Sequence, residues 1–482
     1  AGCRTPRECV VSVMGNISLG GRGGWHRQQA VNYSGNTFIG TFGAGNSGTA
    51  IIELAGTGDQ TIAGQTIPGA WLWSADRPCA ASGYSGGSPG YDTSPLCNSK
   101  YALASLPYLR VNKPSGKFTA TDYVAFSTGF EFLRAGSYEF AGSSLVLTGS
   151  CEDSILKTSG VNLNNLILGH GYAACYDRLR IQDPIVNVLG DLYLVPIDES
   201  VNLGLNEAAG VPGTTINVHG DLYTALDGGT NANVDRPTLN FVGNANQFIR
   251  NILPMTSTIA FAMDITVNKT WGTVTLDGIF GMYGKRFLDN SDSFRAASGS
   301  TFHLYYSRYV SGIGALKAGS STVFDNLIFN DAWALGADVK ANNVTFAATS
   351  STGSPSDVYK VNALQTLTFN GRLSDVAGIS QILLSGPSAQ RIYAVGSNDI
   401  TSGIVRAQVT VDTANAVTLT GNGQDFKPRS FVLSNGTIDM QSNLRVSGGL
   451  LSSAAGTVIN KNGRVLTVIN GATQSLNGTV NP

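Results

Sequence analysis

Charged residues are scarce in this sequence: Asp, Glu, Lys and Arg together make up 13% of 482 residues, about half the ~25% of ordinary globular proteins. The formal net charge is −1, and a chain without a basic excess lacks the electrostatic signature of a protein that binds nucleic acid or an anionic membrane. No apolar run approaches the ~20 residues that a transmembrane helix needs. We therefore expect neither a nucleic-acid partner nor a membrane span.

Cysteine is also scarce, and all six cysteines lie in the first 175 residues. They form three sequence-near pairs, Cys3/Cys9, Cys79/Cys97 and Cys151/Cys175. An even number confined to one end predicts disulfides in an oxidising compartment, with the connectivity left open. Zinc is not expected, because no Cys-x-x-Cys pair occurs and the four histidines are scattered. The chain begins at Ala1 without a leader, as a secreted protein does once its signal peptide is removed, so we expect a secreted, extracellular or cell-surface protein.

The motifs of common enzymes are incomplete. Gly169-His170-Gly171, followed by Arg178, resembles the Gly-His-Gly and later Arg of β-helical polygalacturonases. Those hydrolases need two carboxyl groups flanking the glycosidic bond, and neither their Asp-Asp nor their Asn-Thr-Asp motif occurs here. Ser85 lies in a Gly-x-Ser-x-Gly match, but glycine- and proline-rich sequence replaces the strand and helix of a nucleophile elbow. We expect no catalytic residue and no enzyme.

No cofactor is predicted, because the acidic residues are well spread along the chain. The closest approaches to a cluster are Glu152-Asp153, Asp198-Glu199 and Asp289…Asp292. These are the candidates for a structural calcium ion at a turn, since calcium binds clustered carboxylates.

The chain has abundant glycine, 59 residues, and many short alternating stretches. Residues 186–194 (VNVLGDLYL) and 216–224 (INVHGDLYT) share six of nine letters at an offset of 30. Alternation with period 2 predicts strands with one buried face, and the glycine marks a bend or bulge between them. Asp191 and Asp221 are predicted to cap turns by side-chain-to-backbone hydrogen bonds. Tyr193 and Tyr223 are predicted to face away from the neighbouring leucines.

Weaker copies of this phrase recur downstream. The strand phrases around Leu327, Val344 and Leu367 are separated by 17 and 23 residues, spacings that suit one coil of a β-solenoid. Similar phrases occupy 165–168 and 444–450. The sequence therefore predicts an all-β protein, a β-solenoid or right-handed β-helix over 126–482, preceded by an irregular disulfide-containing cap or insertion-bearing β region over 1–125.

Residues 126–482 resemble the β-strand repeats of large exported bacterial surface proteins, in their Asn-Leu-x-Phe and Val-x-Gly-Asp-Leu phrases. Solenoids of Bacteroidota-type surface proteins are the nearest parallel, with autotransporter passenger adhesins more distant. The resemblance implies an adhesin, sheath or fibre component.

From these features we expect a structural subunit of a surface fibre or adhesin that self-associates through terminal strands. The candidate assembly residues are Val10, Val11, Val13, Met14, Val465, Val468 and Ile469. Two alternatives stay open: a β-helix that binds or degrades polysaccharide, and a trimeric phage-type β-helical fibre. Surface glycans are a further candidate partner, because aromatic residues such as Trp71 and Trp73 concentrate in the first hundred positions. Glycosylation sequons lie at Asn16, Asn32, Asn268, Asn343, Asn435 and Asn477.

Overall fold

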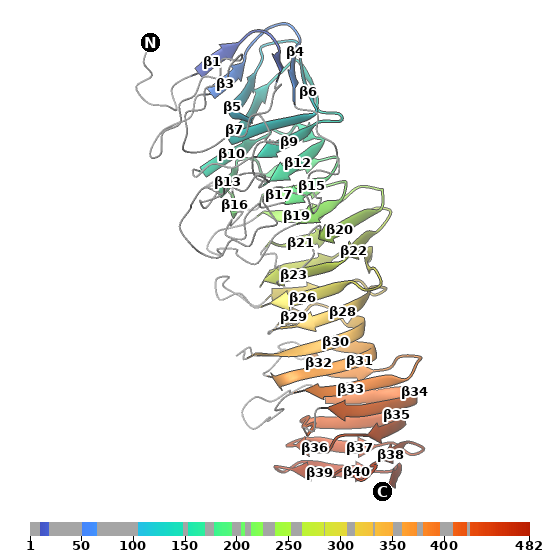
Figure 1. Cartoon of the computed structure of the whole chain (residues 1–482). Coiled ribbons are helices and arrows are strands. Elements are labelled where there is room, and N and C mark those ends of the chain that lie inside the picture. The colour runs from blue at the N-terminus through green and yellow to red at the C-terminus, as the bar shows by residue number, and fades with distance from the viewer. Residues whose placement is uncertain are drawn as a thin grey trace, which may run out of the picture. The chain divides into compact units, whose positions relative to one another are not determined.

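A computed structural model shows a chain built from parallel strands, with no helix among the residues it describes (Figure 1). The described residues are 10–18, 51–64, 105–147, 153–168, 178–194, 204–207, 214–224, 237–251, 263–283, 285–305, 314–330, 333–349, 359–373, 379–395, 408–421 and 425–482. The chain forms two compact units, Ala1–Thr258 and Ile259–Pro482. Successive strands join different sheets, and each strand pairs with its counterpart one coil later. This arrangement is a β-solenoid and confirms the predicted all-β fold class.

The first unit contains three parallel sheets. The longest comprises, in spatial order, β1 (Val10–Val13), β3 (Ile51–Leu54), β5 (Ser105–Asn112), β7 (Tyr123–Arg134), β9 (Ser144–Leu147), β12 (Asn165–Leu168), β15 (Leu192–Leu194), β18 (Leu222–Thr224) and β20 (Gln247–Asn251). A branch from β7 carries β10 (Asp153–Lys157), β13 (Arg178–Ile181) and β16 (Gly204–Glu207). The second sheet comprises β11 (Asn162–Leu163), β14 (Ile185–Val188), β17 (Thr215–Val218) and β19 (Thr238–Phe241). The third comprises β2 (Ile17–Ser18), β4 (Gln60–Ala63), β6 (Lys117–Thr121) and β8 (Ser137–Glu139).

The described residues of the second unit are also parallel strands, and the longest of them, β31, has 15 residues. One parallel series comprises β21 (Ile265–Val267), β24 (Arg286–Asp289), β27 (Gly314–Lys317) and β29 (Trp333–Leu335), and β22 (Val274–Asp277) pairs with β25 (Phe294–Ala296). The main series comprises β23 (Ile279–Tyr283), β26 (Thr301–Tyr305), β28 (Val323–Phe329), β30 (Val339–Thr349), β31 (Tyr359–Leu373), β32 (Ile379–Leu384), β34 (Gln408–Gly421), β35 (Ser430–Met440), β37 (Leu450–Ser453) and β40 (Thr473–Leu476). Beside it lie β33 (Gln390–Val395), β36 (Leu444–Ser447), β38 (Val458–Asn460), β39 (Leu466–Ile469) and β41 (Thr479–Asn481).

The strand register confirms the repeat spacings read from the sequence. Val186 pairs with Ile216, and Leu192 with Leu222, so the offset of 30 is one coil. Val344 lies between Leu327 on one side and Leu367 on the other. The intervals of 17 and 23 residues are therefore also single coils.

The core of each unit is a set of columns in which aligned residues of successive coils stack. In the first unit, one such column contains Leu166, Leu192, Leu222 and Ile249, all buried. The in-register pairing places apolar side chains directly above one another, so every coil covers the apolar face of the one before it. The fold therefore grows by addition of coils.

Parallel pairing is present on both sides of residue 125. The strands β5 and β6 lie before this position, and they pair with β7 and β8. The boundary between a cap over 1–125 and repeats over 126–482 stays a prediction, as does the right-handed sense of the coil.

Candidate functional site: edge strands and polar ladders

Several predicted residues lie outside the described residues. They are the six cysteines (Cys3, Cys9, Cys79, Cys97, Cys151, Cys175), the motif at 169–171, Ser85, Trp71, Trp73 and the sequon at Asn32. The predicted disulfides therefore remain predictions.

The last coil of the second unit is an edge made of three strands, β39, β40 and β41. Each pairs on one side, with β36, β37 and β38 respectively. In the preceding coil Leu444 and Val446 are fully buried, whereas their aligned partners Leu466 and Val468 are only half-buried. Val465 is 43% exposed. The edge thus combines unpaired backbone with incompletely covered apolar side chains, and it contains all three predicted C-terminal assembly residues.

The hydrogen bonds of β39 show which backbone groups point away from the molecule. The amides of Leu444 and Gly448 donate to the carbonyls of Val465 and Ile469, at 2.9 and 3.2 Å. Because the N–H and C=O of one strand residue point to the same side and alternate along the strand, Leu466 and Val468 direct theirs away from β36. Among the described residues, the N–H groups of both and the carbonyl of Leu466 have no strand partner, and the carbonyl of Val468 accepts a hydrogen bond only from the Thr467 hydroxyl, at 3.4 Å.

The first described coil presents the opposite edge. The strand β1 pairs with β3, and Val13 accepts a hydrogen bond from the amide of Ala55 at 3.2 Å. By the same alternation, Ser12 directs its backbone groups away from β3. Val11 and Val13 are half-buried, while Met14 is 68% exposed. All four predicted N-terminal assembly residues therefore lie at a strand edge or in the turn that follows it.

The aspartates of the repeated phrase bind backbone amides, as predicted, but they bind those of the next coil. The Oδ1 of Asp191 accepts from the amide of Asp221 at 2.7 Å, and the Oδ1 of Asp221 accepts from the amide of Phe248 at 2.9 Å. The Oδ1 of Asn165 accepts from the amide of Asp191 in the same way, at 2.8 Å. These side chains form a ladder that links four coils.

The tyrosines of the phrase stack over one another on the face opposite to the buried leucines, as predicted. The rings of Tyr193 and Tyr223 lie 4.7 Å apart at 11°. Their hydroxyls donate to Asp191 and Asp221 of their own coils, at 2.9 and 3.2 Å. Arg250 of the following coil lies 3.6 Å from the Asp221 carboxylate. Burial raises the pKa of Tyr193 and of Tyr223, and the adjacent carboxylates add to the effect.

The pKa of Asp221 is also raised, mainly by burial and in part by the charge of Asp191. The folded chain therefore holds this proton more tightly than the unfolded chain, so stability should fall as the pH rises from about 4, the ordinary pKa of Asp, through the raised folded value. We expect Asp221→Asn to keep the acceptor for Phe248, to raise the melting temperature at neutral pH by roughly 1–3 °C and to flatten its pH dependence. Thermal unfolding between pH 4 and 8 checks this. An unchanged pH slope would contradict it.

Three buried glutamines link neighbouring coils by side-chain hydrogen bonds, and the sequence analysis did not predict them. Its side-chain amide donates to backbone carbonyls of the preceding coil: Gln60 to Val13 and Gly15, Gln247 to Val218 and Gly220, and Gln390 to Ala363. Each of these glutamines is buried. The signal was present as a Gly-x-x-x-Gln-x-Ile phrase at 56–62, 243–249 and 386–392.

Replacing Gln247 by Met should destabilise the first unit by about 1–3 kcal/mol, because the Val218 carbonyl in a buried contact and the Gly220 carbonyl in a partly buried one lose their donor. The change preserves the length of the side chain, so packing is little altered. Gln441→Met, at an exposed glutamine, serves as the control and should be neutral. Urea unfolding measures both variants, and equal unfolding free energies would remove the linking role.

Asparagines form a second ladder. The Nδ2 atoms of Asn187, Asn217 and Asn240 each donate to the Oδ1 of the asparagine one coil earlier, at 3.0, 2.9 and 2.8 Å, beginning at Asn162. Every donor in this ladder points back toward the N-terminus and every acceptor points forward. The contacts between coils are therefore directional.

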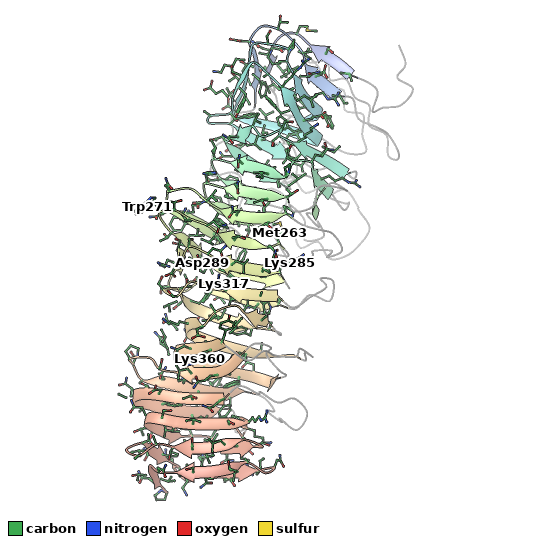
Figure 2. The ribbon with its side chains drawn as sticks, turned by 180° about the vertical axis from the view of Figure 1, so that it is seen from behind. Met263, Trp271, Lys285, Asp289, Lys317 and Lys360 are labelled. Carbon is green, nitrogen blue, oxygen red and sulfur yellow. The ribbon has the colours of Figure 1, made fainter. Side chains whose placement is uncertain are left out.

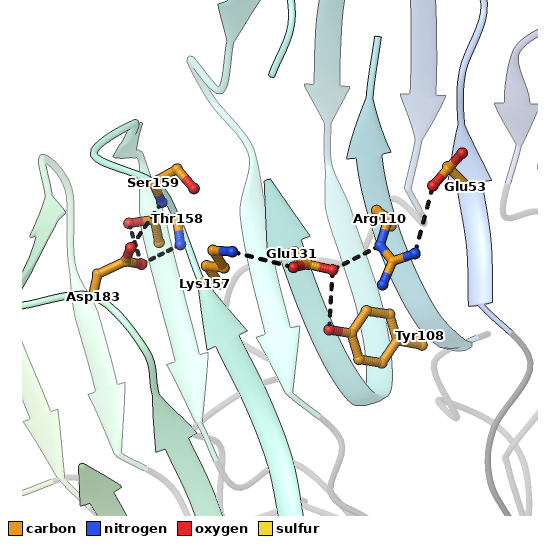
Figure 3. A network of polar contacts seen from close by, with 8 residues as sticks. All are labelled: Glu53, Tyr108, Arg110, Glu131, Lys157, Thr158, Ser159 and Asp183. Atoms are coloured by element: carbon orange, nitrogen blue, oxygen red, sulfur yellow. Dashed lines mark hydrogen bonds and ion pairs between the residues drawn. The ribbon is translucent and has the colours of Figure 1, made fainter. Parts of the chain in front are cut away.

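A row of alternating charges crosses the outward face of the first unit (Figure 3). Glu53, Arg110, Glu131 and Lys157 are aligned on β3, β5, β7 and β10. Arg110 lies 3.6 Å from the Glu53 carboxylate and 2.7 Å from that of Glu131, while Lys157 lies 3.4 Å from Glu131. Burial and Glu131 raise the pKa of Tyr108, whose hydroxyl faces that carboxylate, to about 12. Glu53 and Glu131 thus have the same cation as ionic partner.

Asp289 and Asp292, one of the predicted calcium candidates, accept hydrogen bonds from protein donors. Asp289 is buried, and its carboxylate accepts from the amides of Ser291, Ser293 and Phe294. The carboxylate of Asp292 accepts from the amide and hydroxyl of Ser321 in the next coil. In the part of the chain that the structure describes, no group of three or more His, Cys, Asp or Glu side chains is arranged to hold a metal ion.

The described sequons differ in accessibility. The asparagines at 16, 268, 435 and 477 are exposed. Asn343 is half-buried, and its Nδ2, the atom that would carry a glycan, donates to the Oδ1 of Asn326 at 3.0 Å. Glycosylation of the sequons stays a prediction, with Asn343 the least accessible of these five.

The most exposed large apolar side chain among the described residues is Trp271, at 71%. It lies in the turn between β21 and β22 and projects outward from the ribbon (Figure 2).

Comparisons with protein families, curated proteins and solved structures found no match to this chain. Among the described residues, no helix is long and apolar enough to cross a bilayer.

Proposed function

We propose that this chain is a structural subunit of an extracellular surface fibre or adhesin that assembles through its terminal strands. The observation that carries the proposal is the edge strand β39, which contains the half-buried Leu466 and Val468 and pairs with one strand only, β36, among the described residues. Exposed strand edges recruit further strands, and natural proteins usually blunt them with charges, prolines or bulges. The strand β39, Leu466–Ile469, contains no charged residue and no proline.

The contacts within the solenoid suit a mechanical role. Backbone ladders and the directional side-chain ladders all run from one coil to the next. A strand added at the edge extends these ladders by the same hydrogen bonds that hold the coils together. A head-to-tail contact that does not close on itself generates a filament.

Deleting residues 1–14 tests the proposal, because it removes β1 and, from the next coil, only the contacts with this strand, such as those of Ala55 and Gln60 with the Val13 carbonyl. We expect the full chain to form filaments in negative-stain electron microscopy and the truncated chain to stay monomeric with an unchanged far-ultraviolet circular dichroism spectrum. The control is Leu189→Ser, which removes an apolar side chain that lies between β14 and β15 and is about as exposed as Val10. This variant should still form filaments. Filaments from the truncated chain would rule out β1 as the assembling strand.

A second candidate function is polysaccharide binding, favoured by the charged row beside Tyr108. Aromatic rings stack on sugar rings, and carboxylates accept hydrogen bonds from sugar hydroxyls. On this alternative, Tyr108→Ala and Glu131→Gln should each weaken binding to a polysaccharide at least tenfold in titration calorimetry. A full chain that binds none of a panel of neutral and acidic polysaccharides would remove this candidate.

A further inference from the structure

We infer that the C-terminal edge of one copy receives the N-terminal edge of a second copy, with β1 parallel to β39, Val11 above Leu466 and Val13 above Val468. This inference rests on the proposed function and adds which edges meet and in what register. The partner is a second copy of this chain.

The direction of the backbone groups supports this register. In β36, the amide of the core-facing Leu444 donates to the following coil, and that of the outward-facing Arg445 donates to the preceding coil at 2.9 Å. The two edge strands follow the same pattern. The backbone N–H and C=O of the core-facing Leu466 point away from β36, toward a following coil, and those of the outward-facing Ser12 point away from β3, toward a preceding coil. With Val11 above Leu466, the groups of Leu466 lie between those of Val10 and Ser12, as parallel pairing requires.

The side chains fit the same register. Val11, Val13, Leu466 and Val468 are all half-buried. Within the solenoid, the residues aligned with the last three, Leu54, Leu444 and Val446, are fully buried, and Ile52, aligned with Val11, is half-buried. Bringing the two edges together covers all four, so the junction would be driven by apolar burial and completed by backbone hydrogen bonds.

The direction of side-chain amides favours unlike edges over two like ones. The Nδ2 atoms of Asn470 and Asn481 donate backward to Ser447 and Asn460, at 2.8 and 2.7 Å. The C-terminal edge therefore offers amide oxygens forward, and two such edges would face acceptor to acceptor.

Proline substitutions that block one edge at a time test the inference. Ser12→Pro removes an N–H that points away from β3, and Val468→Pro removes one that points away from β36, so each leaves the existing ladder intact. We expect each variant alone to sediment as a monomer at concentrations where the unchanged chain forms filaments. An equimolar mixture should give a single species of twice the chain mass, joined through its two unblocked edges.

Each other outcome overturns the inference in a recognisable way. Dimers of Ser12→Pro alone would show that two C-terminal edges meet, and dimers of Val468→Pro alone would show that two N-terminal edges meet. In both cases the proposed function stands and the inferred pairing fails. An unchanged chain that stays monomeric overturns the function and the inference together.

A cross-link provides a second test that does not depend on proline. Ser12 and Thr467 are aligned in the inferred register, with Cα atoms about 4.8 Å apart, a separation that a disulfide spans. Mixing Ser12→Cys with Thr467→Cys under oxidation should give a covalent dimer on a non-reducing gel, and either variant alone should not. If both variants form filaments and the mixture gives no dimer, the register is wrong.

Discussion

Phe302→Ala should destabilise the second unit by about 3–5 kcal/mol, the usual cost of truncating a buried phenylalanine. The ring is fully buried in a cluster of four other phenylalanines. It lies 5.3 Å from the rings of Phe287 and Phe324, 5.8 Å from Phe280 and 6.3 Å from Phe294. These rings come from adjacent coils and from different sheets of one coil, so the coils can close only partly around the cavity.

Trp271→Ala is the matched control, because it removes a larger aromatic side chain from the same unit at a site that is mostly exposed. We expect a change of no more than ~0.5 kcal/mol. Guanidinium unfolding followed by circular dichroism measures both variants, with the transition of the second unit fitted separately if the two units unfold apart. Equal effects from the two substitutions would contradict the packing role of Phe302.

Gly220→Ala should cost about 3–5 kcal/mol, since it adds steric strain of ~1–3 kcal/mol to the loss of two hydrogen bonds of ~1 kcal/mol each. An added Cβ would lie 2.4 Å from the carbonyl oxygen of Gly190 and 2.5 Å from the Oδ1 of Asp191. The amides of Gly220 and Asp221 donate to these same two oxygens. Relieving the clash by moving the backbone therefore breaks the ladder.

Gly58→Ala provides the control, because an added Cβ there has nothing within 4 Å. It should leave the free energy of unfolding nearly unchanged. Thermal unfolding of both variants separates the close approach required at Gly220 from the general effect of replacing a glycine. If Gly58→Ala is as destabilising as Gly220→Ala, the close approach to Asp191 does not account for the requirement for glycine at position 220.

The sequence predicted the coils where two conditions were met: strong alternation and a repeated phrase. The pairing of Val186 with Ile216 could be predicted because the flanking Gly-Asp-Leu-Tyr is nearly identical in both copies. The roles of Asp191 and Tyr193 were predicted in kind, as a cap and an opposite-face residue. Their partners were not, because a side chain that caps the next coil looks the same in sequence as one that caps its own turn.

Contacts between residues in coils of unequal length could not be predicted from one sequence. The buried Nζ of Lys113 donates to the carbonyl of Gly56, 57 residues earlier, and to the Oε1 of Gln60. The charged pair Arg110–Glu131 spans 21 residues and the glutamine contact Gln247–Val218 spans 29. Variable turns between strands change each interval, so no fixed period connects such partners. The assembly strands could be proposed because their alternating apolar pattern can be read from a single strand, without knowing its partners.

The aspartate and tyrosine ladders bear on how such a chain can lengthen over generations. Leu192, Asp191 and Tyr193 contact the next coil through Leu222, Asp221 and Tyr223, so at these three positions both surfaces of the coil are formed by the same residue types. A tandem duplication of its thirty codons would place a new coil between two surfaces that already match it. At the leucine, aspartate and tyrosine positions such a duplication needs no compensating substitution, so the number of coils can change by duplication of the gene segment.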